Sequence, residues 1–355
     1  MFKKIFIVIF SVFILLSACT TTPSNTKGVN DDGIPQDQVD KETDTENEEE
    51  LIDEEIDFQK IRPNELGRIM VLMYHQIGPE EREWIRTPDN FRRDLQTLYD
   101  NGYRLVSLRD VLRGEISVPA GYSPVVITFD DGTEGQFRYI EKDGEWVIDP
   151  DSAVGILLEM NEKNPGLGTA ATFFVNSNPF RQPEHTKRKL EELVRFGMDI
   201  GNHTLTHPNL STITSPEEMQ RQMGGLVKEI QSYLPDYQID TLALPFGAHP
   251  KEELYPYAIK GQYEGTEYHH KGILLVGSHP SHSPFHKDFN PLRIPRIRGE
   301  DPFEYGYLYY WLDYFERNPH LRYISDGDPR YVTFPEKLLD EVDLSNFPEK
   351  KIRTY

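Results

Sequence analysis

This 355-residue sequence contains a single cysteine, Cys19, so no disulfide can form within the chain. It also lacks an excess of basic residues, with 38 Lys and Arg against 59 Asp and Glu and a formal net charge of −21. No basic patch of the kind that binds nucleic acid is present, so we expect no nucleic-acid partner. The acidity is concentrated in residues 31–57, which carry fourteen acidic side chains and one lysine, so it says nothing about a substrate.

Long apolar runs are also scarce, and the exception extends from Ile5 to Leu16 near the start of the chain. It follows a short basic segment and is too short to span a bilayer comfortably, which is typical of a secretory signal. It ends in Leu16-Ser17-Ala18-Cys19, which resembles the signal of bacterial lipoproteins, in which the cysteine is lipidated. An ordinary signal peptide is the alternative. We predict a lipoprotein signal over residues 1–19, with the protein lipid-anchored to the cell membrane on its extracytoplasmic face.

Residues 20–60 are polar, acidic and poor in aromatic side chains. Such a segment cannot bury enough apolar surface to offset its conformational entropy, so we predict a disordered tether. Residues 61–345 contain neither a second linker nor an internal repeat, which favours a single domain. We expect this domain to be monomeric.

Short apolar runs alternate with helical patterns along the domain. The runs that suit buried strands are Ile69–Tyr74, Val125–Phe129, Ala170–Val175, Thr241–Leu244 and Ile273–Val276. Helices are predicted to begin at Asp89 or Asn90, around Leu190 and after the N-cap Ser215. This alternation predicts an α/β fold with a parallel sheet, open or closed into a barrel. Two β-like runs within residues 139–148 flank an Asp-Gly pair and predict an inserted β-hairpin.

Three short segments at predicted strand ends carry groups that could do chemistry. Asp130-Asp131-Gly132 places two carboxylates at a sharp turn, although this is also ordinary turn composition. His203 and His207 have the i, i+4 spacing that puts two imidazoles on one face of a helical turn and lets them share a metal, although capping or core histidines could have the same spacing. Pro245-Phe246-Gly247 is a turn and is uninformative alone.

Together, and in this order, the three segments resemble the polysaccharide deacetylases of carbohydrate esterase family four, the NodB-homology domain. Ala170–Val175 is similar to a strand that this family has between its first two motifs. The resemblance covers about residues 69–335. It implies a distorted (β/α) barrel and a metal-dependent hydrolase that acts on linear amide C–N bonds, removing N-acetyl groups from a cell-surface or cell-wall polysaccharide that contains N-acetylglucosamine.

Carried over to this sequence, the resemblance implies that Asp131, His203 and His207 bind a divalent metal and that Asp130 is the general base. One carboxylate and two imidazoles with open positions suit catalytic zinc, while cobalt, nickel or manganese would also fit. The resemblance further implies that a backbone N–H of the Pro245–Gly247 turn stabilises the oxyanion.

The sequence departs from the family pattern in two places. Ala243 occupies the position of an arginine that orients the base in the family, and Arg293 or Arg296 could replace it. A late Leu-x-His segment that carries the general acid is absent. We predict that His75 is the acid, because in a permuted barrel the first strand closes beside the last one and ends on the same face. The alternatives are His279, or a His75 that only bonds a neighbouring loop.

The segment Met73-Tyr74-His75-x-Ile77 also resembles the branch of the family that acts on poly-N-acetylglucosamine. Two other functions stay open. The protein could be a non-catalytic carbohydrate-binding lipoprotein of the same fold, or a metal-uptake lipoprotein that uses a loop rich in histidine. That loop contains His269, His270, His279, His282 and His286, which could equally be solvated side chains.

Overall fold

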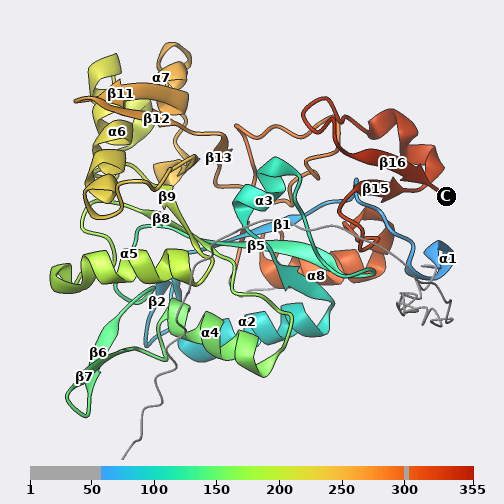
Figure 1. Cartoon of the computed structure of the whole chain (residues 1–355), viewed down its shortest axis with the longest axis horizontal. Coiled ribbons are helices and arrows are strands. Elements are labelled where there is room, and N and C mark those ends of the chain that lie inside the picture. Colours follow the sequence, from blue (N-terminus) through green and yellow to red (C-terminus); the bar gives the residue numbers. More distant parts are fainter. Residues whose placement is uncertain (1–56, 300–303) are drawn as a thin grey trace, which may run out of the picture. The chain divides into compact units, whose positions relative to one another are not determined.

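The computed structural model describes residues 57–299 and 304–355. Seven parallel strands form its central sheet, with an eighth strand added at the side (Figure 1). In sheet order the seven are β13 (Gly272–Leu274), β10 (Thr241–Ala243), β9 (Asp199–Asn202), β8 (Thr172–Val175), β5 (Ser123–Phe129), β1 (Met70–Tyr74) and β14 (Ile297–Arg298). The eighth, β4 (Tyr103–Leu105), pairs with the first half of β5.

The two edges of this sheet are joined by one segment. Ile294 forms a parallel bridge with Leu274 of β13, and Ile297 pairs with Leu72 of β1. The stretch from Ile294 to Arg298, which includes the edge strand β14, therefore pairs with β1 and also bridges the opposite edge strand β13, so the sheet curls round on itself. The predicted distorted (β/α) barrel is confirmed, with seven strands around the barrel where a regular one has eight.

Burial explains why these segments are strands. Every residue of β1 and β5 is buried, as expected for strands covered on both faces. The strand β9 was not predicted, because Asp199-Ile200-Gly201-Asn202 contains only one large apolar residue. Its membership of the sheet depends on pairing with β8 on one side and β10 on the other.

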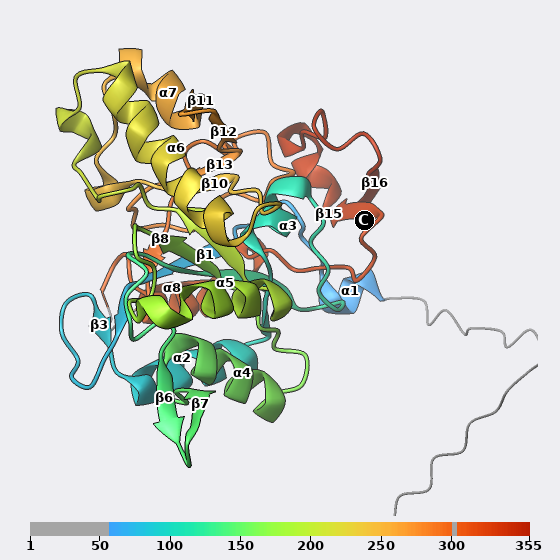
Figure 2. The same ribbon diagram turned by 60° about the vertical axis from the view of Figure 1, so that its left-hand side comes forward.

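Helices cover the outside of the strands, and Figures 1 and 2 show α2 and α4 side by side with α5 next to them. The helices are α1 (Phe58–Ile61), α2 (Pro88–Asp100), α3 (Leu108–Arg113), α4 (Ala153–Lys163), α5 (Thr186–Arg195), α6 (Pro216–Tyr233), α7 (Tyr255–Ile259) and α8 (Leu308–Arg317). Ser215 caps α6 as predicted, since its hydroxyl accepts the N–H of Glu218. The predicted start of α2 was wrong: Thr87 is the cap, because its hydroxyl accepts the N–H of Asn90.

Small two-stranded units surround the barrel. They are β2 (Gln76–Ile77) with β3 (Ile85–Arg86), β6 (Tyr139–Lys142) with β7 (Glu145–Ile148), β11 (Lys260–Tyr263) with β12 (Thr266–His269), and β15 (Tyr331–Phe334) with β16 (Lys351–Thr354). The pair β6 and β7 is the predicted hairpin, and it projects beyond α4 in both views (Figures 1 and 2). Pairing of β16 with β15 carries the folded unit to Thr354, past the predicted boundary at residue 345.

The signal over residues 1–19, the lipidation site Cys19 and residues 20–56 of the predicted tether lie outside the described residues. The remaining tether residues enter α1, whose N-cap is Asp57. In residues 57–299 and 304–355, no helix has both the length and the apolar character needed to cross a bilayer.

Candidate metal centre

The predicted site residues follow the ends of strands of the central sheet. Asp130 and Asp131 come directly after β5, and His203 comes directly after β9. Backbone hydrogen bonds align these ends, since Asp130 N–H donates to Tyr74 of β1 and His203 N–H donates to Val175 of β8. The carboxyl ends of parallel strands therefore gather these side chains at one end of the barrel, where such folds build their sites.

The two adjacent carboxylates separate because the chain turns sharply between them. Asp131 has φ 77° and Gly132 has φ 57°, so both lie in the left-handed region. A Cβ at position 132 would lie 3.1 Å from a side-chain carbon of Val175. Glycine at this position therefore also lets the turn pack closely against β8. Asp130 consequently points inward with a 2% exposed side chain, while Asp131 remains 34% exposed.

Asp131, His203 and His207 come together as a possible ligand set. Their ligand atoms lie within 4.8 Å of one another. Oδ1 of Asp131 is 3.5 Å from Nε2 of His203 and 3.3 Å from Nε2 of His207. Ligands held at about 2.0–2.2 Å from a tetrahedral ion are about 3.4 Å apart, so the spacing of these donors fits zinc or a similar divalent metal.

The second ring nitrogen of His203 supports the same role. Its Nδ1 lies 2.8 Å from the carbonyl oxygen of Ala243, to which only a protonated nitrogen can donate. A proton on Nδ1 leaves the lone pair of Nε2 directed at Asp131. Metal-binding histidines are commonly oriented in this way by a backbone carbonyl.

The two histidines meet without the predicted helical turn. Thr204 has φ 70° and His207 has φ 58°, so the backbone reverses between them instead of coiling. The Thr204 N–H donates to the side chain of Asn202, and the His207 N–H donates to the Thr204 hydroxyl. These side-chain acceptors replace helical hydrogen bonds, and the two imidazole centroids end 4.9 Å apart.

Asn202 is a supporting residue that sequence reasoning missed. Its amide nitrogen donates to the carbonyl of Met223 on α6 and lies 3.1 Å from the fully buried His270. Its carbonyl oxygen is thereby oriented toward Thr204. His270 is therefore a buried partner of this turn and not a solvated loop histidine.

Arg296 orients the candidate base. Its Nη1 and Nη2 each lie 2.7 Å from one carboxylate oxygen of Asp130, which makes a bidentate pair. Its Nε donates to the carbonyl of Leu275, and its side chain is fully buried. Arg293, the other candidate, is exposed and lies 3.2 Å from His249, so it does not serve Asp130.

Opposing effects determine the pKa of Asp130. Burial alone would raise it, but the positive charge of Arg296, followed by that of His203 when protonated, outweighs burial and lowers the pKa well below its usual range. The pKa of Asp131 is also lowered, because its burial, which would raise it, is outweighed by the nearby His203 when that ring is protonated. Both carboxylates are therefore ionised, as a base and a metal ligand must be.

His75 belongs to the same electrostatic cluster. Burial lowers its pKa, while the charges of Asp130 and Asp131 raise it in part. Its Nδ1 is buried without a hydrogen-bond partner among the described residues. The ring packs against Trp84 with centroids 4.5 Å apart, and the guanidinium of Arg298 lies 3.7 Å from the Trp84 ring centroid. A buried nitrogen without a partner is uncommon, and together with the nearby carboxylates it makes His75 the candidate proton donor of this site.

Gln136 links the base and the candidate acid, and no sequence signal pointed to it. Its fully buried amide nitrogen donates to the backbone carbonyls of both Asp130 and His75. It thereby holds the two residues that follow β5 and β1 at a defined separation.

The Pro245–Gly247 turn provides the last predicted element. Phe246 has φ 58°, is 68% exposed, and its ring centroid lies 4.5 Å from that of His207. Proline has no N–H, and the N–H of Gly247 is used by the carbonyl of Leu244. The N–H of Phe246 is therefore the amide of this turn that could act as an oxyanion donor.

Comparison with known proteins shows which family the chain resembles. Residues 118–261 match the family model of the polysaccharide deacetylases. This part of the chain is similar to a polysaccharide deacetylase domain. The Bacillus subtilis protein YxkH, whose name assigns it to the polysaccharide deacetylases, is 24% identical over 200 residues, which are 55% of this chain and 62% of that protein.

Two solved structures are similar to this chain. One is the Streptococcus pyogenes deacetylase PplD in complex with acetate, at 23% identity and a TM-score of 0.49, covering 65% of this chain and 92% of that one. The other is a Bacillus cereus polysaccharide deacetylase, at 21% identity and a TM-score of 0.49, covering 65% of this chain and 64% of that one.

The matched range divides the candidate site in two. It contains Asp130, Asp131, both candidate ligand histidines and the Pro245–Gly247 turn. His75 and Arg296 lie outside it, directly after the first strand and on the closing segment of the barrel. They are the residues predicted for the two roles in which the sequence departs from the family pattern.

Proposed function

We propose that this protein is a metal-dependent deacetylase that removes N-acetyl groups from a cell-surface or cell-wall polysaccharide containing N-acetylglucosamine. The observation that carries the proposal is the geometry of one end of the barrel. A two-imidazole, one-carboxylate cluster with metal spacing lies beside a buried carboxylate, Asp130, that Arg296 holds ionised. A protein that only binds carbohydrate has no need for a desolvated, arginine-paired carboxylate next to a metal site.

A divalent ion held by Asp131, His203 and His207 would lower the pKa of a water and polarise the acetamide carbonyl. Asp130 accepts the proton of the attacking water, because its carboxylate is ionised and fixed by two hydrogen bonds from Arg296. The Phe246 N–H donates to the oxyanion that develops on the carbonyl oxygen. Water adds to the carbonyl carbon, the C–N bond breaks, and acetate is formed.

His75 donates a proton to the nitrogen that leaves. An amide nitrogen is a poor leaving group unless it is protonated as the C–N bond breaks. His75 is the titratable group outside the ligand set that lies within the field of both carboxylates. Gln136 fixes the separation of this acid from Asp130 through their backbone carbonyls. The products are a free sugar amine and acetate.

The substrate branch is suggested by the first strand. Met73-Tyr74-His75-x-Ile77 resembles the deacetylases that act on poly-N-acetylglucosamine, and here the segment leads from β1 into the site. Peptidoglycan and chitin-like oligomers present the same acetamide. A panel of these three polymers therefore tests the branch separately from the activity.

The activity test measures acetate released from N-acetylglucosamine oligomers by the full chain, before and after chelation and after added zinc, cobalt, nickel or manganese. We expect turnover that chelation abolishes and that at least one of these metals restores. His203→Ala should release no acetate and should lose metal. Binding of the oligomers without acetate release under every metal would instead support the non-catalytic carbohydrate-binding protein.

We further propose that Cys19 anchors the enzyme to the outer face of the cell membrane. The support comes from the Leu16-Ser17-Ala18-Cys19 sequence and from the absence of any other cysteine. Cys19→Ser should move the protein from the membrane fraction to the soluble fraction of cells without changing its specific activity. Continued membrane association of this variant would contradict lipidation.

A further inference from the structure

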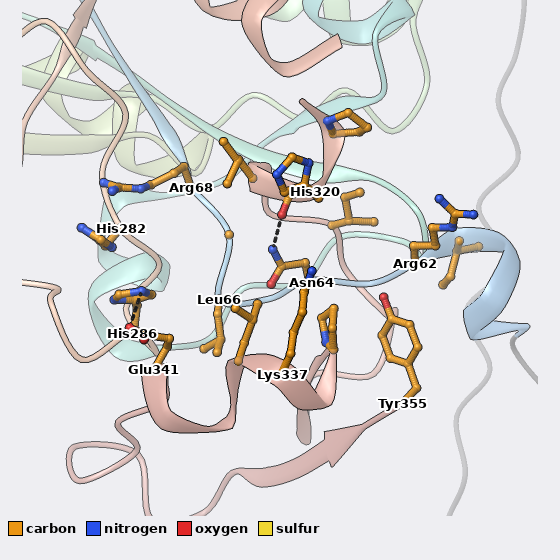
Figure 3. Close-up of a pocket in the computed structure, with 17 residues that line it drawn as sticks. Arg62, Asn64, Leu66, Arg68, His282, His286, His320, Lys337, Glu341 and Tyr355 are labelled. Atoms are coloured by element: carbon orange, nitrogen blue, oxygen red, sulfur yellow. Dashed lines mark hydrogen bonds and ion pairs between the residues drawn. The ribbon is translucent and has the colours of Figure 1, made fainter. Parts of the chain in front are cut away.

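A second cluster of possible ligands lies away from the deacetylase site, in the loop that follows β13. Ser281 in this loop pairs with Ile69 at the start of β1, whereas His75 follows the end of that strand. About six residues of strand separate the two ends, or roughly 20 Å. Figure 3 shows His282 and His286 at the edge of a pocket of about 610 Å³, with Glu341 below them. The cluster is therefore separate from Asp131, His203 and His207.

Three side chains of this loop could bind one cation. Each of His282, His286 and Asp288 offers one ligand atom, and these atoms lie within 4.8 Å of one another. The imidazole centroids of the two histidines are 4.2 Å apart. Oδ2 of Asp288 is 3.9 Å from Nδ1 of His286. In the part of the chain that the structure describes, only the deacetylase site shows another group of this kind.

His282 presents a second, independent observation. Its Nδ1 is buried and has no hydrogen-bond partner among the described residues. A buried polar atom without a partner is uncommon in proteins and commonly marks the place of an ion or a water.

We propose that His282, His286 and Asp288 form a second binding site for a divalent transition metal. Two imidazoles and one carboxylate suit zinc, nickel, cobalt or copper better than calcium or magnesium, which prefer oxygen ligands. The site does not depend on the proposed function, because none of its three residues belongs to the deacetylase site.

The hydrogen bonds of His286 decide which nitrogen would bind the ion. Nδ1 accepts the backbone N–H of Asp288 at 3.1 Å, so the proton of the neutral ring resides on Nε2. Nε2 faces a carboxylate oxygen of Glu341 at 3.7 Å. The ion therefore binds Nδ1 in place of the Asp288 N–H, and Glu341 orients the ring from the other side, as carboxylates do behind metal-bound histidines.

The separations leave the site slightly open. Donor atoms around a tetrahedral ion lie about 3.4 Å apart, so the 3.9 Å between Asp288 and His286 must shorten by about half an ångström. The carboxylate of Asp288 is 60% exposed and can move by this amount. Metal binding should therefore draw Asp288 inward and reduce its exposure.

Nearby charges make this site weaker than the deacetylase site. Arg68 lies close enough to lower the pKa of both His282 and His286, and it opposes a cation. Lys287 also competes for Glu341, since its Nζ lies 3.1 Å from the same carboxylate. Asp288 and Glu341 offset these two positive charges. We therefore expect the second metal to dissociate first when metal is withdrawn.

A bound ion would fasten this loop to the C-terminal segment of the domain. The backbone of His286 already bridges Val342, and the Lys287 N–H donates to the carbonyl of Glu341. An ion on Nδ1 would fix the ring of His286, whose Nε2 faces the Glu341 carboxylate. The expected consequence is stability of the fold, since an ion that binds only the folded state stabilises it by mass action.

The test counts metal on the full chain by equilibrium dialysis against micromolar zinc, followed by elemental analysis. In a His203→Ala/His207→Ala background we expect about one ion per chain and a higher Tm with zinc than without it. Adding His282→Ala should remove this ion or weaken its binding at least tenfold, and should abolish the rise in Tm. Cobalt in the same background should give the visible absorption of a tetrahedral site with nitrogen and oxygen ligands.

Two matched controls are available in the same region. His279 and His320 are exposed histidines outside the cluster, so His279→Ala and His320→Ala should leave the count unchanged. Asp288→Asn replaces a proposed ligand at an exposed position. It is the alternative test variant if His282→Ala does not fold. The proposal is overturned if the background variant binds no ion at micromolar zinc, or if neither His282→Ala nor Asp288→Asn weakens binding.

Discussion

Arg296 and Asp130 are 166 residues apart in the sequence, and they form a buried bidentate ion pair beside the ligand cluster. The family resemblance places an arginine at position 243, where this chain has Ala243 on β10. The side chain of Arg296 instead reaches Asp130 from the segment that closes the barrel. Its Nη1 also donates to Thr128, so the guanidinium is fixed by the strand that carries the base. A closed sheet allows this exchange, because the closing segment borders β1 and β5 lies next to β1.

Asp130→Asn should lower kcat by on the order of 10²–10⁴-fold, the range typical of a general base, while metal content stays the same. The amide keeps the size of the carboxylate but cannot accept the proton. Metal analysis and acetate release on the same preparation test this. Loss of the metal would show that the roles of Asp130 and Asp131 are interchanged.

Arg296→Met should destabilise the domain by about 3–5 kcal/mol, because it leaves the buried carboxylate of Asp130 unpaired. Arg293→Met removes an exposed arginine from the same segment and should change the free energy of unfolding by less than about 0.5 kcal/mol. Urea unfolding of both variants measures the difference. The double variant Asp130→Asn/Arg296→Met should recover part of the lost stability and none of the activity. Equal effects of the two arginine substitutions would contradict the pairing.

His75→Gln should depress turnover of N-acetylglucosamine oligomers on the order of 10²–10⁴-fold without loss of metal. The same variant should retain most of its activity on an aryl acetate ester, because a phenolate leaves without being protonated. The ratio of the two activities therefore reports whether His75 is an acid. A parallel loss on both substrates would indicate a structural role, such as packing against Trp84.

Glu65 should make stability depend on pH. Burial, followed by the charge of Asp326, raises its pKa to about 8, so the folded state holds a proton that the unfolded state releases near pH 4.5. Stability from this group is therefore lost as pH rises between these values, by up to about 1.4 kcal/mol per unit. Glu65→Gln removes this titratable group and with it the pH dependence, whether the substitution itself raises or lowers the free energy of unfolding.

The measurement for Glu65 is the free energy of unfolding of both proteins from pH 5 to pH 8. Relative to wild type, Glu65→Gln should gain stability as pH rises. Glu336→Gln, at an exposed position, should follow the wild-type curve. A difference between Glu65→Gln and wild type that does not change with pH would show that Glu65 is ionised in the folded state.

The barrel strands with continuous apolar runs were predictable because local pattern and burial agree in them. All five predicted strands are present, including β1 and β5, whose residues are buried throughout. The candidate ligand residues were predictable because their types and order in the chain carry the resemblance. The shape of the turn that holds these residues could not be predicted, because it depends on a hydrogen bond from the Thr204 N–H to the side chain of Asn202.

Residue types and spacing predicted the parallel α/β fold and the hairpin over residues 139–148, and the family resemblance implied the candidate ligands Asp131, His203 and His207. Only the tertiary structure decided that Arg296 and not Arg293 serves Asp130, that Gln136 spans the base and His75, and that His282 and His286 meet Asp288. Each of these contacts joins segments through the curvature of the sheet or the path of a loop. One-dimensional patterns record the period of a strand or helix, but they do not record which distant segment closes a barrel.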